Sequence, residues 1–311
     1  MAELVALLDI GSNACRFVLA RISPGTGFRV LREERVQTRL GGGRPGALPR
    51  DAIDATLSSI HRFLGRFRTG RVPRILAVAT SAVREAANRE RLLDALRQRE
   101  GIEVEVLSGS DEAHLGALAV LRSLPVRDAL IADLGGGSLQ LTRLRDARVA
   151  AVSSLRLGAV HLTSRFLRHD PPTVHEVRAL RQETRDRLLE TIPPAPSGDA
   201  LVGLGGTVRA LARIHLATGG TLATRGTRLP VRHGLPLHQS DVTAIRERLE
   251  RLPIEGRRRL PGLKAERADI IVAGALVVEE LMLFGGYFVL TVCAHRVRDG
   301  LLWREASVAE P

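Results

Sequence analysis

A turn rich in glycine occurs twice in this chain, each time directly after a short apolar run that ends in an aspartate. The first copy is Asp9-Ile10-Gly11-Ser12-Asn13 and the second is Asp133-Leu134-Gly135-Gly136-Gly137-Ser138. Apolar runs on both sides of each turn are typical of strands, so each turn is expected at the tip of a hairpin. Glycines there let successive backbone N–H groups point outward and bind an anion, while the aspartate can hold a cation. The pair of turns therefore predicts a clamp on phosphate.

Length and composition set the broad class of the protein. A chain of 311 residues with 44% hydrophobic residues is long enough for about two domains, each with a core. Cys15 and Cys293 lie far apart without metal-ligand spacing, which argues against a disulfide framework or a zinc site. The apolar N-terminal run is short, no basic segment precedes it, and no stretch reaches membrane-spanning length. We therefore expect a cytoplasmic protein without a membrane partner.

The charge of the chain favours anionic ligands. The formal net charge is +12, and among the 46 basic residues only Lys264 is lysine. Excess positive charge attracts polyanions, and the planar fork of arginine matches phosphate oxygens. Aromatic residues make up only 3% of the chain, which leaves few stacking platforms for a single-stranded nucleic acid, and no helix-turn-helix or finger pattern occurs. A phosphate-rich small molecule or polymer is thus favoured over a nucleic acid.

The chain divides into two halves of similar plan. Each half opens with a hairpin and a third strand and then alternates helices with buried strands, so we expect domains at 1–125 and 126–311. In the first half we expect further strands at 28–38, 75–79 and 103–107, and helices at 51–67, 82–99 and 113–124. In the second half we expect strands at 149–155, 201–204 and 287–292, and helices at 158–168, 174–191, 208–217, 241–252 and 268–284. A last helix, about 297–308, could pack back on the first domain; 193–198 is expected as a surface linker and 257–259 as a solvated loop.

A third glycine site supports one particular architecture. Gly205-Gly206-Thr207 follows a strand and opens a helix, where free N–H groups and the helix dipole attract anions. The first two glycine turns each join a strand to a strand, whereas the glycine motifs of Rossmann and P-loop proteins lead from a strand into a helix. Neither of those motifs is present in this chain. Two hairpins with the aspartate in register, followed by this third site, are the plan of the actin-like superfamily. The expected fold is α/β, with two ribonuclease-H-like (actin-like) domains flanking a central cleft.

Over nearly its whole length the chain resembles the exopolyphosphatase and guanosine pentaphosphate phosphohydrolase (Ppx/GppA) family. Kinases of the actin-like superfamily keep the two glycine turns but lack counterparts of two other segments that match this family, 80–86 and 109–113. Besides the two turns, with Arg16 after the first, the matching segments are Arg39-Leu40-Gly41, 79–86 with Asn88, 108–113, 203–207, His233-Gly234, 267–271 and 298–301.

The resemblance implies a role for each motif residue. Glu112 would be the general base that activates water against a terminal phosphoryl group. Asp9, Asp133 and Gln140 would hold Mg²⁺ or another divalent cation. The residues implied to bind substrate phosphates are Gly11, Ser12, Asn13, Arg16, Thr80, Ser81, Arg84, Gly135, Gly136, Gly137, Ser138, Gly205, Gly206 and Thr207.

Plain structural roles remain open for several of these residues. A carboxylate such as Glu112 also stabilises a helix start, and a turn aspartate often bonds its own loop. Arg16 could lie along its strand, and Arg84 could pair with Glu85 or Glu112.

Departures from the family pattern bear on turnover. Gln140 stands where a glutamate is usual, so an oxygen ligand is kept but a negative charge is lost, and cation binding should weaken. Near the C-terminus, Cys293-Ala294 replaces a frequent Ser-Asp, and Asp299 replaces a glutamate.

Several functions follow as hypotheses. The first is a Mg²⁺-dependent exopolyphosphatase that releases terminal phosphate from inorganic polyphosphate. The alternatives are hydrolysis of guanosine pentaphosphate, with guanosine penta- or tetraphosphate as ligand, and a non-catalytic sensor of alarmone or polyphosphate, which the substitution at Gln140 suggests. A small-molecule kinase on the same scaffold is a further option that the motif set disfavours. The apolar run 270–283 leaves a homodimer open, although a buried core helix explains the same pattern.

Overall fold

The computed structural model describes residues 2–43, 46–67, 73–191, 199–219 and 233–308. Contacts within the chain divide it into two units, Met1–Leu118 with Val297–Pro311, and Ala119–Arg296. The limits 1–125 and 126–311 expected from the sequence stay predictions for the extent of each domain. The expected linker at 193–198 lies outside the described residues.

The first unit is built on a mixed five-stranded sheet of order β3-β2-β1-β4-β5. The hairpin strands β1 and β2 and the following β3 are antiparallel, whereas β4 runs parallel to β1 and β5 parallel to β4. The strands are β1 (Glu3–Ile10), β2 (Cys15–Ser23), β3 (Gly27–Val36), β4 (Arg74–Ala79) and β5 (Glu105–Val106). The helices are α1 (Arg50–Leu64), α2 (Ser81–Arg84), α3 (Glu90–Glu100), α4 (Gly109–Leu121) and α11 (Val297–Val308), with short 3₁₀ turns at Leu40–Gly42 and Gly65–Phe67.

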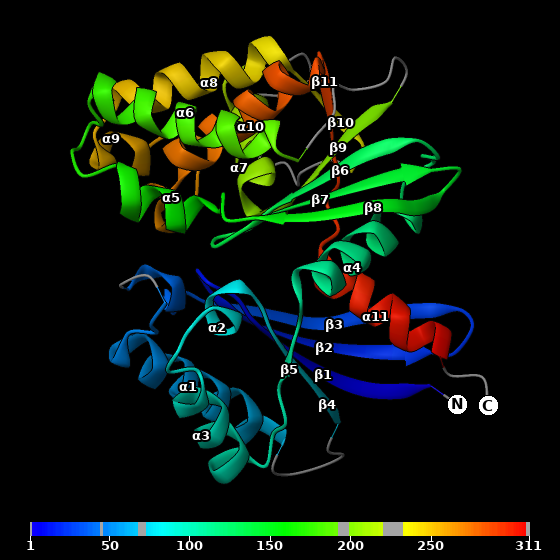
Figure 1. The fold of residues 1–311 in the computed structure, drawn as a ribbon. Helices are drawn as coiled ribbons and strands as arrows, with labels where there is room; N and C mark the ends of the chain where they lie inside the picture. Colours follow the sequence, from blue (N-terminus) through cyan, green and yellow to red (C-terminus); the bar gives the residue numbers. More distant parts are fainter. Residues whose placement is uncertain (1, 44–45, 68–72, 192–198, 220–232, 309–311) are drawn as a thin grey trace. The chain divides into compact units, whose positions relative to one another are not determined.

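Both faces of this sheet are covered because alternate residues of β1 point to opposite sides. Ala6, Leu8 and Ile10 belong to a core cluster shared with α1 and α3. Val5 and Leu7 belong to a second cluster, to which α11 contributes. In Figure 1, α1 and α3 lie on one side of the sheet and α11 on the other. The last helix therefore covers the sheet face that also carries Asp9, since Asp9 is in phase with Leu7.

The second unit repeats the plan in a six-stranded sheet of order β10-β11-β9-β6-β7-β8. The antiparallel β6, β7 and β8 correspond to β1, β2 and β3, and β9 and β11 follow in parallel like β4 and β5. The bounds are β6 (Ala129–Leu134), β7 (Leu139–Arg145), β8 (Arg148–Leu155), β9 (Ala200–Leu204), β10 (Leu235–His238) and β11 (Val289–Val292). This duplication confirms the expected α/β class with two ribonuclease-H-like domains.

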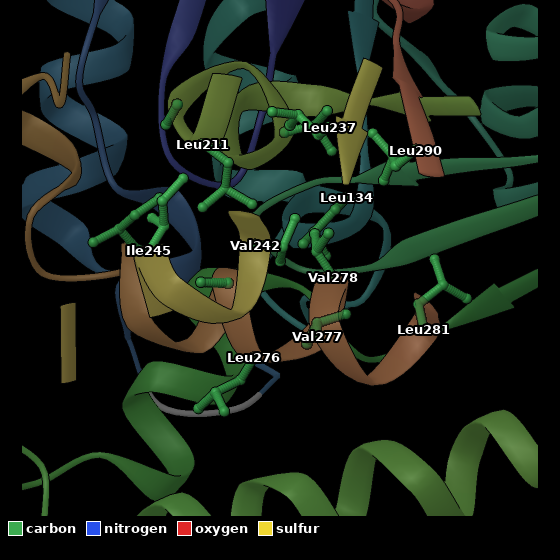
Figure 2. Close-up of a cluster of buried hydrophobic side chains, with 14 of the residues drawn as sticks. Leu134, Leu211, Leu237, Val242, Ile245, Leu276, Val277, Val278, Leu281 and Leu290 are labelled. Atoms are coloured by element: carbon green, nitrogen blue, oxygen red, sulfur yellow. The ribbon is translucent and has the colours of Figure 1, made fainter. Parts of the chain in front are cut away.

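Helices of the second unit pack around the buried helix α10 (Ile271–Gly285). Figure 2 shows Leu276 and Val277 of α10 in one apolar cluster with Leu211, Val242 and Ile245 from two neighbouring helices. A helix that is apolar on all sides is typically buried in this way, so a core helix explains the run 270–283. The other helices are α5 (Ala159–Phe166), α6 (Val174–Leu189), α7 (Gly205–Ala217), α8 (Gln239–Arg251) and α9 (Ile254–Arg258), with a 3₁₀ turn at Ala265–Arg267.

Two sequence predictions in these regions were wrong. The helix expected at 82–99 is interrupted, because Asn88 bonds the backbone of Leu48 through both its amide atoms, at 2.8 and 3.0 Å, and the chain between α2 and α3 turns to allow it. The run expected as a solvated loop at 257–259 is partly helical, and Arg257 is buried against Asp170. Both differences arise from partners that lie 40 or more residues away in the sequence.

No helix within the described parts of the chain has the length and apolarity needed to span a bilayer.

Candidate functional site

The first glycine turn is closed by its own backbone and supported from two sides. Gly11 N–H donates to Ala14 O at 3.2 Å, which forms the tip between β1 and β2. The loop after β3 packs over this tip, with Gly41 N–H donating to Ser12 O at 2.8 Å and Arg39 N–H donating to Asn13 O at 3.2 Å. A side chain on Gly41 would lie 2.9 Å from the Ser12 Cβ, which explains the glycine.

Ser12 and Ser81, both predicted to bind phosphate, meet in the structure. Their hydroxyl oxygens are 2.9 Å apart and both residues are buried. Thr80, just before Ser81, donates its N–H to Ile10 O at 3.3 Å and so extends the sheet up to the turn. The first turn and the start of α2 are therefore held together by a hydroxyl contact and a backbone hydrogen bond.

Asp9 lies between two arginines of the same unit. It faces Arg16 across the β1–β2 ladder, and the charges of Arg16 and Arg298 both act on it. Burial raises the pKa of Asp9, and the two arginines oppose this rise. Burial, and then the like charge of Arg298, lower the pKa of Arg16 to about 10. The role of Asp9 as a metal ligand stays a prediction.

Arg298 and Asp299 were missed as site residues by the sequence reasoning. Both influence Asp9, and they come from the start of α11, nearly 300 residues away. The available signal was the matching segment at 298–301, for which no role had been inferred.

The buried Glu112 forms an ion pair with Arg84, whose side chain is partly exposed. Arg84 Nη1 donates to Glu112 Oε2 and to Leu107 O, each at 2.7 Å, and the Glu112 residue is 6% exposed. The structure thus brings together the predicted general base and a predicted phosphate-binding arginine. It also realises the pairing of Arg84 with Glu112 that the sequence had left open.

The neighbouring Asp111 already fulfils the helix-capping role considered for Glu112. The Ser108 hydroxyl and N–H donate to Asp111 Oδ2 at 2.6 and 3.0 Å, and these bonds lower the pKa of Asp111. Since Asp111 satisfies the start of α4, the burial of Glu112 needs another explanation.

The second glycine turn has the same closure as the first. Gly135 N–H donates to Ser138 O at 2.9 Å, and Asp133 faces Gln140 across the β6–β7 ladder as Asp9 faces Arg16. The segment that opens α5 supports the turn, because Gly158, Ala159 and Val160 N–H groups donate to its carbonyls at 2.8–3.2 Å. Gln140 therefore takes the place that Arg16 has in the first turn, and it is buried.

Gln140 is also held by neutral hydroxyl groups. Its Nε2 donates to Ser138 Oγ at 2.6 Å and to Ser154 Oγ at 3.3 Å, and both Gln140 and Ser138 are buried. These contacts fix the amide next to Asp133.

The third glycine site lies directly beside Asp133. Gly205 begins α7 with φ +93°, and a Cβ there would lie 2.9 Å from Asp133 Oδ1. At Gly206 a Cβ would lie 2.3 Å from Arg267 Nη1, so a buried arginine that sequence reasoning did not assign packs on this turn. Thr207 is fully buried with its hydroxyl 3.4 Å from Arg267 Nη2, and its role in phosphate binding stays a prediction.

The oxygen donors around Asp133 fit a magnesium ion that is held together with substrate. They are the Asp133 carboxylate, the Ser138 hydroxyl and the Gln140 amide oxygen, in the turn and on the two strands that it joins, and the backbone of Gly205 packs closely against Asp133. Among the described residues no group of three or more His, Cys, Asp or Glu could hold a metal ion. Mg²⁺ commonly binds through one or two carboxylates, waters and substrate phosphates, so a single carboxylate is compatible with it.

Replacing Gly158 by alanine should distort the second turn. The new Cβ would lie 2.2 Å from Gly137 C and 2.3 Å from Gly136 O, where only a backbone shift relieves the clash. We expect a loss of unfolding free energy of about 1–3 kcal/mol, measured by urea denaturation. Gly65→Ala is the control, because no atom lies within 4 Å of a Cβ there; equal effects of the two changes would contradict the prediction.

Comparison with known proteins identifies the family. The model of the Ppx/GppA phosphatase family matches residues 18–308. The chain belongs to this family. Exopolyphosphatase 1 and exopolyphosphatase 2 of Mycobacterium tuberculosis are each 32% identical to it, over 97% of this chain and 88% of the first relative, and over 96% of this chain and 97% of the second.

A solved structure of the Ppx/GppA family agrees over both units. The crystal structure of the Aquifex aeolicus family member has a TM-score of 0.80 and 29% sequence identity, with 98% of each chain covered. An exopolyphosphatase structure from Cytophaga hutchinsonii, 23% identical with a TM-score of 0.85, shares the fold. The family and its fold, both expected from the motifs, are confirmed.

Proposed function

We propose that this Ppx/GppA phosphatase is an exopolyphosphatase that releases terminal phosphate from inorganic polyphosphate. The observation that carries the proposal is the Glu112–Arg84 pair, which joins a buried carboxylate able to accept a proton to a partly exposed cation able to hold a phosphoryl group. The curated relatives that bear the name exopolyphosphatase, at 32% identity, support the same substrate class.

The proposed reaction is a single displacement by water. Glu112 accepts one proton of the water while the water oxygen forms a bond to the terminal phosphorus. The bond from that phosphorus to the bridging oxygen breaks, and the shortened polyphosphate leaves with the bridging oxygen. Arg84 stabilises the negative charge on the transferring group, because phosphoryl transfer depends mostly on positioning and charge neutralisation.

Asp133, with Ser138 and Gln140, would hold Mg²⁺. The ion, when bound, neutralises charge on the phosphate oxygens. The N–H groups of the glycine turns and of the start of α7 supply further neutral donors for phosphates. Ser12, Asn13, Thr80 and Ser81 would take the same role in the first unit.

A phosphate-release assay tests the proposal. Purified protein with Mg²⁺ and long-chain polyphosphate is expected to release inorganic phosphate, and excess EDTA should abolish release. Competition between polyphosphate and guanosine pentaphosphate would show which of them is the better substrate. If none of the polyphosphate lengths tested released phosphate, the proposal would be overturned.

A second candidate function, a non-catalytic sensor of polyphosphate or an alarmone, is favoured by one observation. The neutral Gln140 faces Asp133 where the family usually has an acidic ligand, and its amide is bonded to two serine hydroxyls. A sensor would bind the anion through the same turns without turnover.

The change Gln140→Glu separates the two functions. A carboxylate facing Asp133 should lower the Mg²⁺ concentration for half-maximal activity by about tenfold, as expected for one added charged ligand contact. Gln98→Glu, an exposed change on α3, is the control for added negative charge. High activity of the unmodified protein would exclude the sensor, whereas activity that appears only in Gln140→Glu would support it.

A further inference from the structure

Arg298 is a buried cation whose hydrogen-bonding capacity is only partly used. It is 4% exposed and lies in the first turn of α11. Its Nη2 donates to Glu33 Oε1 at 2.7 Å. Its Nε and Nη1 atoms are buried and have no hydrogen-bond partner within the part of the chain that the structure describes. Leaving charged donors unsatisfied in a protein interior is costly, which suggests that a ligand completes them.

The packing of α11 places this arginine beside the residues of the proposed site. Gly300 lies against the backbone of α4, since a Cβ there would be 1.9 Å from Leu115 O. Leu115 is three residues after Glu112, so it lies on the same side of α4 as the proposed base. On the other side, the charge of Arg298 acts on Asp9 and Arg16 at the first glycine turn. Arg298 therefore acts on the first glycine turn and lies on a helix that packs against α4, which carries Glu112.

Charge in this region favours an added anion. Arg16 and Arg298 are like charges close enough to oppose each other, and both are largely withdrawn from solvent. Asn13, in the first turn, has a second buried donor, Nδ2, that has no partner among the described residues. A phosphate oxygen could accept from these groups and reduce the repulsion between the two cations.

We propose that Arg298 binds a phosphate group of the substrate through Nη1, with Glu33 holding Nη2 and thereby orienting the guanidinium. This inference rests on the proposed function, since it adds a substrate-binding residue to the same site. The contact needs a planar guanidinium with one terminal nitrogen on Glu33 and the other on phosphate, and a lysine ammonium cannot reproduce that fixed geometry.

Two substitutions at Arg298 and one control test the proposal. Arg298→Ala removes the donors, and Arg298→Lys keeps a cation for Glu33 but loses the planar fork. Arg304→Ala is the matched control, because Arg304 lies on the same helix, is partly exposed and pairs with Glu105. We expect Arg298→Ala to weaken tripolyphosphate binding at least about tenfold and Arg298→Lys to weaken it less, with Arg304→Ala unchanged.

The single tryptophan of the chain reports whether α11 stays in place. Trp303 lies on α11 and packs edge-on against Phe28 of β3, at 5.3 Å between ring centroids. A variant with native Trp303 fluorescence and far-UV circular dichroism has retained this packing. Should Arg298→Ala fail this check, Arg298→Lys is the deciding variant. Tripolyphosphate binding equal to that of the unmodified protein, in a variant that passes, would overturn the proposal.

Binding and turnover are measured separately so that the two proposals can fail independently. Isothermal titration with tripolyphosphate, in EDTA to prevent turnover, reads the Arg298 contact, and phosphate release reads the exopolyphosphatase activity. An unmodified protein that binds in an Arg298-dependent manner but hydrolyses nothing would refute only the proposed function. Robust hydrolysis with binding that is indifferent to Arg298 would refute only this inference.

Discussion

Replacing Glu112 by glutamine is expected to lower kcat for phosphate release by roughly 10²- to 10⁴-fold, the usual contribution of a positioned general base. The amide oxygen of glutamine can still accept the hydrogen bond from Arg84 that the carboxylate accepts at 2.7 Å. An amide cannot take a proton from water, however, so the chemical step alone should suffer. KM for polyphosphate is expected to change little, because Glu112 is not assigned to substrate binding.

Asp111→Asn is the matched control for Glu112→Gln. It neutralises the adjacent carboxylate, whose contacts are to Ser108 at the start of α4. We expect a loss of helix stability of about 1 kcal/mol or less and a kcat close to that of the unmodified protein. A Glu112→Gln variant that is folded and retains more than about a tenth of kcat would rule out Glu112 as the general base.

Local sequence was sufficient to predict the two glycine hairpins. An aspartate, glycines and flanking apolar runs encode the turn within about a dozen residues, and Gly11 and Gly135 close their turns through equivalent bonds. The repetition of that unit predicted the duplicated sheets, because each hairpin starts a half with the same order of strands.

Contacts between distant segments were beyond reach of the sequence patterns. Arg298 approaches Asp9 only because α11 returns to the face of the first sheet, and no periodicity within 297–308 indicates which face it covers. Arg257 was expected in solvent because three consecutive arginines are usually exposed, yet Asp170 offers it a partner. In both segments, pairing with distant residues decides where the side chains lie, and local propensity does not predict it.

The substitution Glu279→Ala should produce the largest loss of stability. Glu279 and Glu280 are buried in the apolar helix α10, each about 1% exposed. Arg246 of α8 donates to Glu279 through Nε and Nη2 at 3.0 and 2.9 Å, and Arg181 of α6 also pairs with it. Arg185 of α6 pairs with Glu280 at 2.6 Å, so the acidic pair joins three helices.

Removing one carboxylate leaves its cations in place. Arg246 has little exposure, and after Glu279→Ala it would lose the partner that accepts two of its hydrogen bonds. Arg246 keeps Glu250 and Arg181 keeps Glu280, each at 3.0 Å, so both cations stay partly compensated. Breaking a buried ion pair typically costs about 3–5 kcal/mol, and we therefore expect a loss at the lower end of that range, about 3 kcal/mol. We expect that decrease in unfolding free energy in urea denaturation followed by far-UV circular dichroism, with Trp303 fluorescence recorded to follow the first unit.

Glu247→Ala provides the control on the same arginine. Glu247 pairs with Arg246 at 3.4 Å but is 45% exposed in its side chain, so water replaces it readily. An exposed pair of this kind is worth about 0–1 kcal/mol. If both variants lost the same small amount, the arginines at α10 would have to reach solvent when Glu279 is absent, and the network would then be a surface feature. A large loss for Glu279 alone would show that these charges hold α6 and α8 against α10.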